Sequence, residues 1–333
     1  MKRIRQLDGV RAIAILAVFL HHALKIKLLW MGVDLFFVLS GFLITGVLLE
    51  IKRRSFGDLL RRFYFRRAVR ILPPYLLTLA LATVLLGTAW MRSWYLYIFL
   101  ANLFLPLHVW HPLALEPLWS LAVEEQFYLL WPFAVYFLDR NSLRRLALAL
   151  LVLAPLLRGL FLFGDSWPIY TLTPFRMDLL AAGALLALEW RRDPARIARR
   201  GPALGVLLAA VGIAGLGLLD RLHVTTYGNT RTGNVLIYEC SLLFCLGFVL
   251  YALSARKTGW LCIRPLTYLG QISYTMYLVH LGVIGFAQAH FRPGASFAAA
   301  LAITLAYASL SWFLMEAPLL GWGRNAEAAG VAS

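Results

Sequence analysis

Long apolar stretches alternate along this chain with short polar segments that are rich in Lys and Arg. Ten of the apolar stretches are about 20 residues long, the length that a helix needs to cross a hydrocarbon layer of roughly 30 Å. They are Gly9–Leu29, Met31–Glu50, Pro73–Ala89, Leu118–Leu138, Leu143–Phe163, Thr173–Trp190, Pro202–Leu219, Asn234–Leu253, Leu266–Phe286 and Phe297–Met315. The pattern predicts an all-α, polytopic membrane protein with about ten transmembrane helices.

Trp94–Leu107 is apolar as well, but it is short. Its Trp, Tyr and His residues are typical of the membrane interface, so we expect an interfacial or re-entrant segment. Gly41, Gly46 and Gly183 lie inside predicted spans, where glycine permits close contact between helices.

Composition and charge support the membrane interpretation. Of 333 residues, 61% are apolar and 14% charged, whereas soluble domains contain roughly 45–50% and 25%. A net charge of +16 could indicate nucleic-acid binding, but the positions of the basic residues argue against it. Starting from the N-terminal segment, 23 of the 32 basic residues fall in alternate loops. Six fall in the other loops: Lys25, Lys27, Arg92, Arg221, Arg231 and Arg292. This asymmetry predicts that both termini are cytoplasmic and that nucleic acid is not a partner.

Ionisable residues inside the predicted spans are candidates for a functional site, because a charge in hydrocarbon is costly. Counting a rise of about 1.5 Å per residue places His22, Glu124 and His280 at one depth, roughly 20 Å from the cytoplasmic boundary. The remaining ones lie near the outer ends of their spans: Asp34, Arg176, Asp178 and Glu239. We therefore expect one polar cluster in the outer half of the bundle. Arg11 precedes His22 by three helical turns, so both should project from one face.

An arginine-rich segment, Arg61–Pro74, precedes the third span and contains Arg61, Arg62, Arg66, Arg67 and Arg70. Guanidinium groups bind phosphate through paired hydrogen bonds, which favours a phosphorylated ligand. Attraction to anionic lipid would produce the same pattern.

Six blocks in this order resemble the motifs of the acyltransferase 3 family of integral membrane O-acyltransferases. The first block is LDGVRAIAILAVFLHH, which holds Arg11 and His22 at the family's spacing. The others are GVDLFFVLSGFLIT (Gly32–Thr45), FRRAVRILPPY (Phe65–Tyr75), PLWSLAVEEQFYLLWP (Pro117–Pro132), FRMDLLAAGALLA (Phe175–Ala187) and ISYTMYLVH (Ile272–His280). Two positions depart from the family pattern: Val10 replaces a common Leu, and His21 replaces the usual Tyr.

The resemblance implies transfer of an acyl group, most often acetyl, from cytoplasmic acyl-CoA to a hydroxyl of a carbohydrate or lipid-linked glycan. It implies a multi-pass location in the plasma (bacterial inner) membrane, acyl-CoA as a donor substrate rather than a tightly bound cofactor, and no metal. We expect an integral membrane acyltransferase domain over residues 1–320 and a short cytoplasmic tail over residues 321–333. This arrangement resembles the family's stand-alone form, which has no C-terminal soluble domain.

The resemblance also suggests roles for individual residues. His22 is the expected base, Glu124 its carboxylate partner in preference to Glu125, and Arg11 a third catalytic residue. Arg11, Arg67 and Arg70 are expected to bind acyl-CoA. Acceptor-binding or supporting roles are expected for Asp34, Ser40, Trp119, Glu125, Tyr128, Arg176, Asp178 and His280.

Other interpretations of the same residues stay open at this point. His22 could simply donate to a backbone carbonyl, and Asp178 could form a structural ion pair with Arg176. Because neighbouring helix positions point about 100° apart, we expect only one of Glu124 and Glu125 to face the site. At the level of the whole chain, the alternative is a multi-span transporter or flippase of a small anionic or glycolipid substrate; such proteins usually show inverted repeats. A non-enzymatic membrane sensor is the other alternative.

Overall fold

The computed structural model describes residues 4–109, 111–224, 229–254 and 258–328, and within them every regular element is helical. The α-helices are α1 (Arg5–Leu24), α2 (Gly32–Ile51), α3 (Phe56–Leu86), α4 (Ala101–Phe104), α5 (Leu118–Phe137), α6 (Arg140–Leu160), α7 (Trp167–Thr171), α8 (Met177–Arg192), α9 (Pro194–Arg221), α10 (Arg231–Ser254), α11 (Arg264–His290), α12 (Pro293–Ser311) and α13 (Ala317–Ala328). Short 3-10 turns are η1 (Lys27–Met31), η2 (Ala89–Arg92), η3 (Trp94–Leu96), η4 (Leu105–Leu107), η5 (Leu113–Leu115), η6 (Thr173–Phe175) and η7 (Gly259–Cys262), and η8 (Trp312–Glu316) is a π-helical turn. The all-α prediction is confirmed.

Seven helical segments of the described chain are long and apolar enough to cross a membrane. They are Arg5–Leu24, Lys27–Ile51, Phe56–Leu86, Pro194–Arg221, Arg231–Ser254, Arg264–His290 and Pro293–Asn325. The predicted count of about ten spans is not confirmed, and the orientation of the termini stays a prediction.

The other three predicted spans coincide with α5, α6 and α8. Each of these helices is too polar or too short to count among the apolar spans. Helix α5 carries the polar run Glu124–Glu125–Gln126 at its middle. Helix α6 has three arginines, Arg144, Arg145 and Arg158, within the predicted stretch. Helix α8 is 16 residues long, which gives a length of about 24 Å.

The arginine-rich segment and the third span form one continuous helix, α3, of 31 residues. Pro73 and Pro74 lie inside this helix, although proline cannot donate the helical hydrogen bond. The segment Trp94–Leu107 consists of the short pieces η3, α4 and η4, in agreement with an element that does not span.

Glycines set two close helix crossings. A Cβ added at Gly41 of α2 would lie 1.9 Å from the Leu180 carbonyl oxygen of α8, and one at Gly183 would lie 2.1 Å from the Val38 carbonyl oxygen. Close contact at Gly41 and Gly183 was predicted and is confirmed, whereas the Gly46 carbonyl accepts a hydrogen bond from Arg191. A Cβ at Gly270 of α11 would similarly lie 1.9 Å from the Asp8 carbonyl oxygen of α1.

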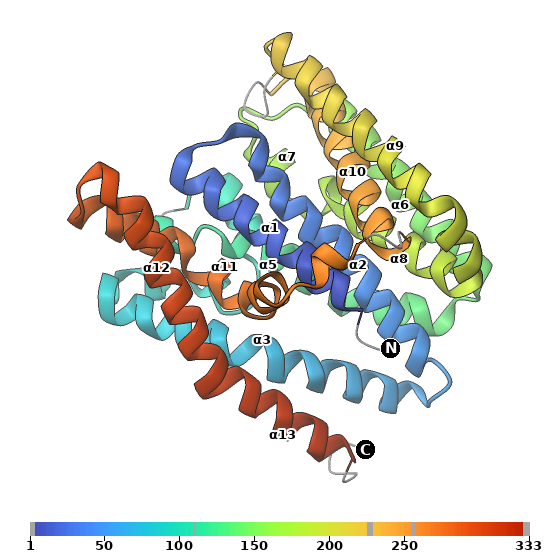
Figure 1. Ribbon diagram of the computed structural model, residues 1–333, viewed down its shortest axis with the longest axis horizontal. Coiled ribbons are helices and arrows are strands. Elements are labelled where there is room, and N and C mark those ends of the chain that lie inside the picture. The colour runs from blue at the N-terminus through green and yellow to red at the C-terminus, as the bar shows by residue number, and fades with distance from the viewer. Residues whose placement is uncertain (1–3, 110, 225–228, 255–257, 329–333) are drawn as a thin grey trace.

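These crossings place α1 and α2 in the middle of the molecule (Figure 1). Helices α9 and α10 lie side by side along one edge, and α3 lies with α13 along another. Helix α13 runs from Ala317 to Ala328, so it continues across the predicted boundary at residue 320. Four basic residues of the charge count, Lys2, Arg3, Arg256 and Lys257, lie outside the described residues, as do residues 329–333 of the predicted tail.

Candidate active site

A cavity of about 80 Å³ between α1, α2, α3, α5 and α11 collects most of the predicted donor-site residues. We call it the arginine cavity. Its polar lining is Arg11, Ser40, Arg67, Arg70, Ser120, Glu124, Glu125, Tyr128, Ser273, Tyr274 and Tyr277. The structure thus brings together seven of the residues named from the sequence.

Both adjacent carboxyl groups of α5 line this cavity. The Ser40 hydroxyl donates a hydrogen bond to Oε1 of Glu124, which fixes that side chain against α2. The prediction that only one of Glu124 and Glu125 faces the site is wrong, because the cavity extends around α5 from α2 to α3 and α11.

Arg67 and Arg70 stand out among the cavity's cations. Within the described residues, neither guanidinium has a hydrogen bond or an ion pair with an acid. Arg67 lies over the Tyr128 ring, 4.9 Å from its centroid, and Arg11 lies 3.8 Å from Asp8. Arginines with spare donors are suited to an anionic ligand.

Two further cavities adjoin the arginine cavity through shared arginines. One, of about 440 Å³, lies between α3 and α13 and shares Arg67 and Arg70. The other, of about 550 Å³, shares Arg11 and is also lined by Arg54, Arg66 and two acids, Asp8 and Glu50. The arginine cavity therefore adjoins a larger region in which arginines outnumber acids.

A separate cavity of about 440 Å³ contains His22, and we call it the histidine cavity. Trp119, another predicted site residue, lines it as well. The histidine cavity and the arginine cavity share two lining residues, Val33 and Tyr277, so they adjoin there.

Hydrogen bonds around His22 determine which ring nitrogen is available. Nδ1 of His280 lies 2.6 Å from the Tyr277 carbonyl oxygen, which can only accept, so this nitrogen carries the proton. Nε2 of a neutral His280 then accepts, and it lies 3.3 Å from Nδ1 of His22. That same Nδ1 lies 2.9 Å from the Val18 carbonyl oxygen, so it too is the protonated nitrogen. Nε2 of His22 has no hydrogen-bond partner among the described residues and keeps its lone pair.

His21 makes a different contact, because its Nδ1 lies 2.9 Å from the Ile26 carbonyl oxygen. It does not bond His280 in the structure. The alternative that His22 donates to a backbone carbonyl is thus correct for Nδ1. Nε2 stays available to accept a proton.

Tyr277 separates the two cavities. Its hydroxyl lies 2.6 Å from the Ser120 hydroxyl, on the arginine-cavity side, and donates to the Pro117 carbonyl at 3.2 Å, on the histidine-cavity side. Its own carbonyl holds His280 in place. Tyr277 was not identified from the sequence, although it lies three residues before His280 and therefore on the same helix face.

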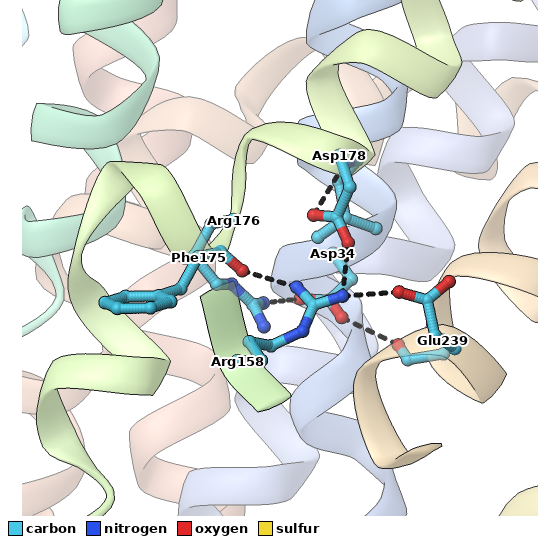
Figure 2. A network of polar contacts seen from close by, with 8 residues as sticks. Asp34, Arg158, Phe175, Arg176, Asp178 and Glu239 are labelled. Carbon is cyan, nitrogen blue, oxygen red and sulfur yellow. Dashed lines mark hydrogen bonds and ion pairs between the residues drawn. The ribbon is translucent and has the colours of Figure 1, made fainter. Parts of the chain in front are cut away.

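Asp34, Arg176 and Asp178 lie in neither cavity; they are fully buried and belong to a separate polar network (Figure 2). Arg176 pairs with Asp34, which also accepts from the Ser241 hydroxyl at 2.7 Å. Figure 2 shows Arg158 between Asp178, at 2.6 Å, and Glu239. The alternative that Asp178 pairs with Arg176 is wrong, because its partner is Arg158.

The expected single polar cluster is therefore three groups: the arginine cavity, the histidine pair and the buried network. Depth along a helix does not specify rotation about its axis, so residues at one level can face different neighbours. Arg158 could have been found from the sequence, since an ionisable residue within a span requires a partner.

A family model described as an acyltransferase domain matches residues 4–316. The chain belongs to the acyltransferase 3 family. Over 349 residues, this family member is 29% identical to the O-acetyltransferase OatA of Staphylococcus aureus strain NCTC 8325 / PS 47, covering 94% of the chain and 56% of that protein. It is 28% identical over 352 residues to a putative O-acetyltransferase of Staphylococcus aureus strain COL, covering 96% and 57%.

The chain spans about half the length of the curated relatives it matches. No solved structure matches it. Family membership confirms the predicted resemblance and, with these relatives, supports an acyltransferase enzyme in a membrane.

Proposed function

We propose that the chain transfers an acetyl group from acetyl-CoA to a hydroxyl of a carbohydrate, at the plasma membrane. The observation that carries the proposal is the junction at Tyr277, where a cavity with unpaired arginines adjoins a cavity with an unpaired histidine nitrogen. The names of the relatives, O-acetyltransferases, support acetyl as the acyl group.

The arginine cavity and its two basic neighbours are the donor side of this proposal. Arg11, Arg67 and Arg70 bind the phosphates of CoA, because guanidinium groups pair with phosphate through two hydrogen bonds. A space of about 80 Å³ is too small for CoA itself but admits the acyl end. The nucleotide end of CoA then occupies the larger basic cavities.

The histidine cavity is the acceptor side. The acceptor's hydroxyl oxygen attacks the thioester carbonyl carbon while Nε2 of His22 takes the hydroxyl proton. The carbon–sulfur bond breaks, and the proton passes from the imidazolium to the sulfur, which leaves as the free thiol of CoA. His280, bonded to the Tyr277 carbonyl, orients His22 as a positioning residue.

Glu124 has a supporting role on the donor side. Its carboxylate is held by Ser40 and is influenced by the charges of Arg67 and Arg11. It attracts these guanidinium groups through its charge without pairing with either of them. Glu125 lines the same space without a hydrogen bond from another described residue.

Labelled acetyl-CoA incubated with membranes that contain the chain tests the proposal. We expect the label in a glycan, with no incorporation when His22 is replaced by Ala. Label that enters the vesicles without becoming covalently bound would contradict the proposal and support transport.

A further inference from the structure

Aromatic rings form one wall of the histidine cavity. Trp30, Trp119, Trp167 and Tyr170 all line it. Tyr170 packs against the other three, with ring centroids 4.8 Å from Trp119 and 6.2 Å from both Trp30 and Trp167. These mutual contacts hold the rings rigid. The C–H faces of a pyranose ring are apolar, and a rigid aromatic wall is suited to pack against them.

The same cavity also has basic lining residues. Lys25 and Lys27, both exposed, line it beside His22. Neither lysine has an ion pair or a hydrogen bond within the part of the chain that the structure describes. The cavity's acidic lining residue is Glu116, and burial raises the pKa of its carboxyl, which favours the neutral form.

The location of these lysines is unusual for a membrane protein of this charge pattern. Basic residues of membrane proteins concentrate on the cytoplasmic side, and the predicted topology puts six of 32 on the other side. Two of these six flank the histidine cavity. Two lysines on the side where basic residues are rare, both lining one cavity, indicate that the histidine cavity binds an anionic ligand.

From this juxtaposition of an aromatic wall and two unpaired lysines, we propose that the acceptor is an anionic carbohydrate, whose sugar ring packs on the wall and whose carboxylate or phosphate contacts Lys25 and Lys27. The inference rests on the function proposed above and specifies the charge of its acceptor. Both lysines are exposed to solvent, so each ion pair with the ligand is weak. Together they are expected to make an anionic sugar bind roughly fivefold more tightly than a neutral one.

Equilibrium binding to the full chain in vesicles of neutral phosphatidylcholine tests the inference. The probes are fluorescently labelled oligosaccharides: one of glucose, one of glucuronic acid and one of glucose carrying phosphate. We expect one or both anionic probes to bind roughly fivefold more tightly than the neutral one at low salt. The preference should weaken in 0.5 M salt, where the Debye length is only about 4 Å. The two anionic arms separate a carboxylate ligand from a phosphate ligand.

Matched variants identify the residues responsible. The double variant K25Q/K27Q should lose the preference, and K25R/K27R should keep it, because the charge is retained. R92Q is the control, since Arg92 is an exposed basic residue that does not line the cavity. Equal binding of all three probes by the native chain, or a preference that K25Q/K27Q leaves intact, would overturn the inference.

Parallel measurement of label transfer from acetyl-CoA separates this inference from the proposed function. Transfer to neutral and anionic acceptors with equal efficiency would overturn the charge preference and leave the enzyme intact. Charge-selective binding without transfer to any acceptor would support the anion site and overturn the acetyl transfer.

Discussion

Arginine occurs in two contrasting settings in this protein. Arg158 and Arg176 are fully buried, and each pairs with at least one acid in the network of Figure 2. Arg67 and Arg70 line a cavity, and no acid among the described residues pairs with either. The first pair satisfies charge that the fold has buried, and the second leaves donors for a ligand. Of these four arginines, the two paired with an acid thus belong to the buried network, and the two without a paired acid line the proposed site.

The largest expected effect concerns the unpaired nitrogen of His22. Replacing His22 with Ala removes the general base and should lower the rate of acetyl transfer by about 10²–10⁴-fold. His290→Ala is the matched control, because His290 is exposed at the end of α11 and its one hydrogen bond among the described residues is with the Phe286 carbonyl. The measurement is acetyl transfer by equal amounts of folded protein. Near-normal turnover by His22→Ala would show that the unpaired nitrogen of His22 is not the general base.

The next largest effect is expected for the buried ion pair between Arg176 and Asp34. Arg176→Met leaves the carboxylate of Asp34 buried without its cation, and the free energy of unfolding should fall by about 3–5 kcal/mol. The double variant Arg176→Met/Asp34→Leu removes both charges and should recover much of this loss. Thermal unfolding in detergent measures both. A double variant as unstable as the single one would show that the pair has a role beyond mutual neutralisation.

A smaller effect is expected for the double variant Arg67→Gln/Arg70→Gln. The apparent KM for acetyl-CoA should rise by about 10–100-fold, because two charge-assisted contacts with phosphate are lost. The unfolding temperature should stay that of the native chain, since neither side chain has a paired acid to leave behind. Arg145→Gln, an exposed arginine on α6, is the control. An unchanged KM would favour the alternative that these arginines contact anionic lipid.

The smallest effect is expected at Tyr277, where the two cavities meet. Tyr277→Phe keeps the ring but removes the hydroxyl that contacts Ser120 and Pro117. Loss of one neutral hydrogen bond corresponds to about 1 kcal/mol, so the ratio of acetyl transfer to acetyl-CoA hydrolysis should fall by roughly fivefold. Both products are measured in one assay. An unchanged ratio would show that the ring alone separates the cavities.

Much of this architecture could be predicted from the sequence, because apolar length is a local property. All ten predicted stretches are mainly helical, and Gly41 and Gly183 lie at close helix crossings as expected. Three stretches fail as apolar spans because α5 and α6 contain charges and α8 is short. Sequence periodicity identifies where a helix lies but not how many charges the surrounding helices can satisfy.

The site could be predicted only in part. The family motifs led to Arg11, Glu124 and His22, and the structure places them in two adjoining cavities. The pairing of Asp178 with Arg158 depends on how α6 and α8 rotate against each other, which residue spacing within one helix does not specify. Tyr277 was missed because its role arises from contacts with residues of α5 and the preceding turn.

Sidedness of the reaction is the most direct test of the two-cavity account. Sealed vesicles are prepared from membranes that contain the chain and its natural glycan, in both orientations, and labelled acetyl-CoA is added outside. We predict labelled glycan inside those vesicles whose cytoplasmic face is outward, and none when that face is inward. Labelling of glycan on the same side as the added acetyl-CoA would contradict transfer between the arginine cavity and the histidine cavity.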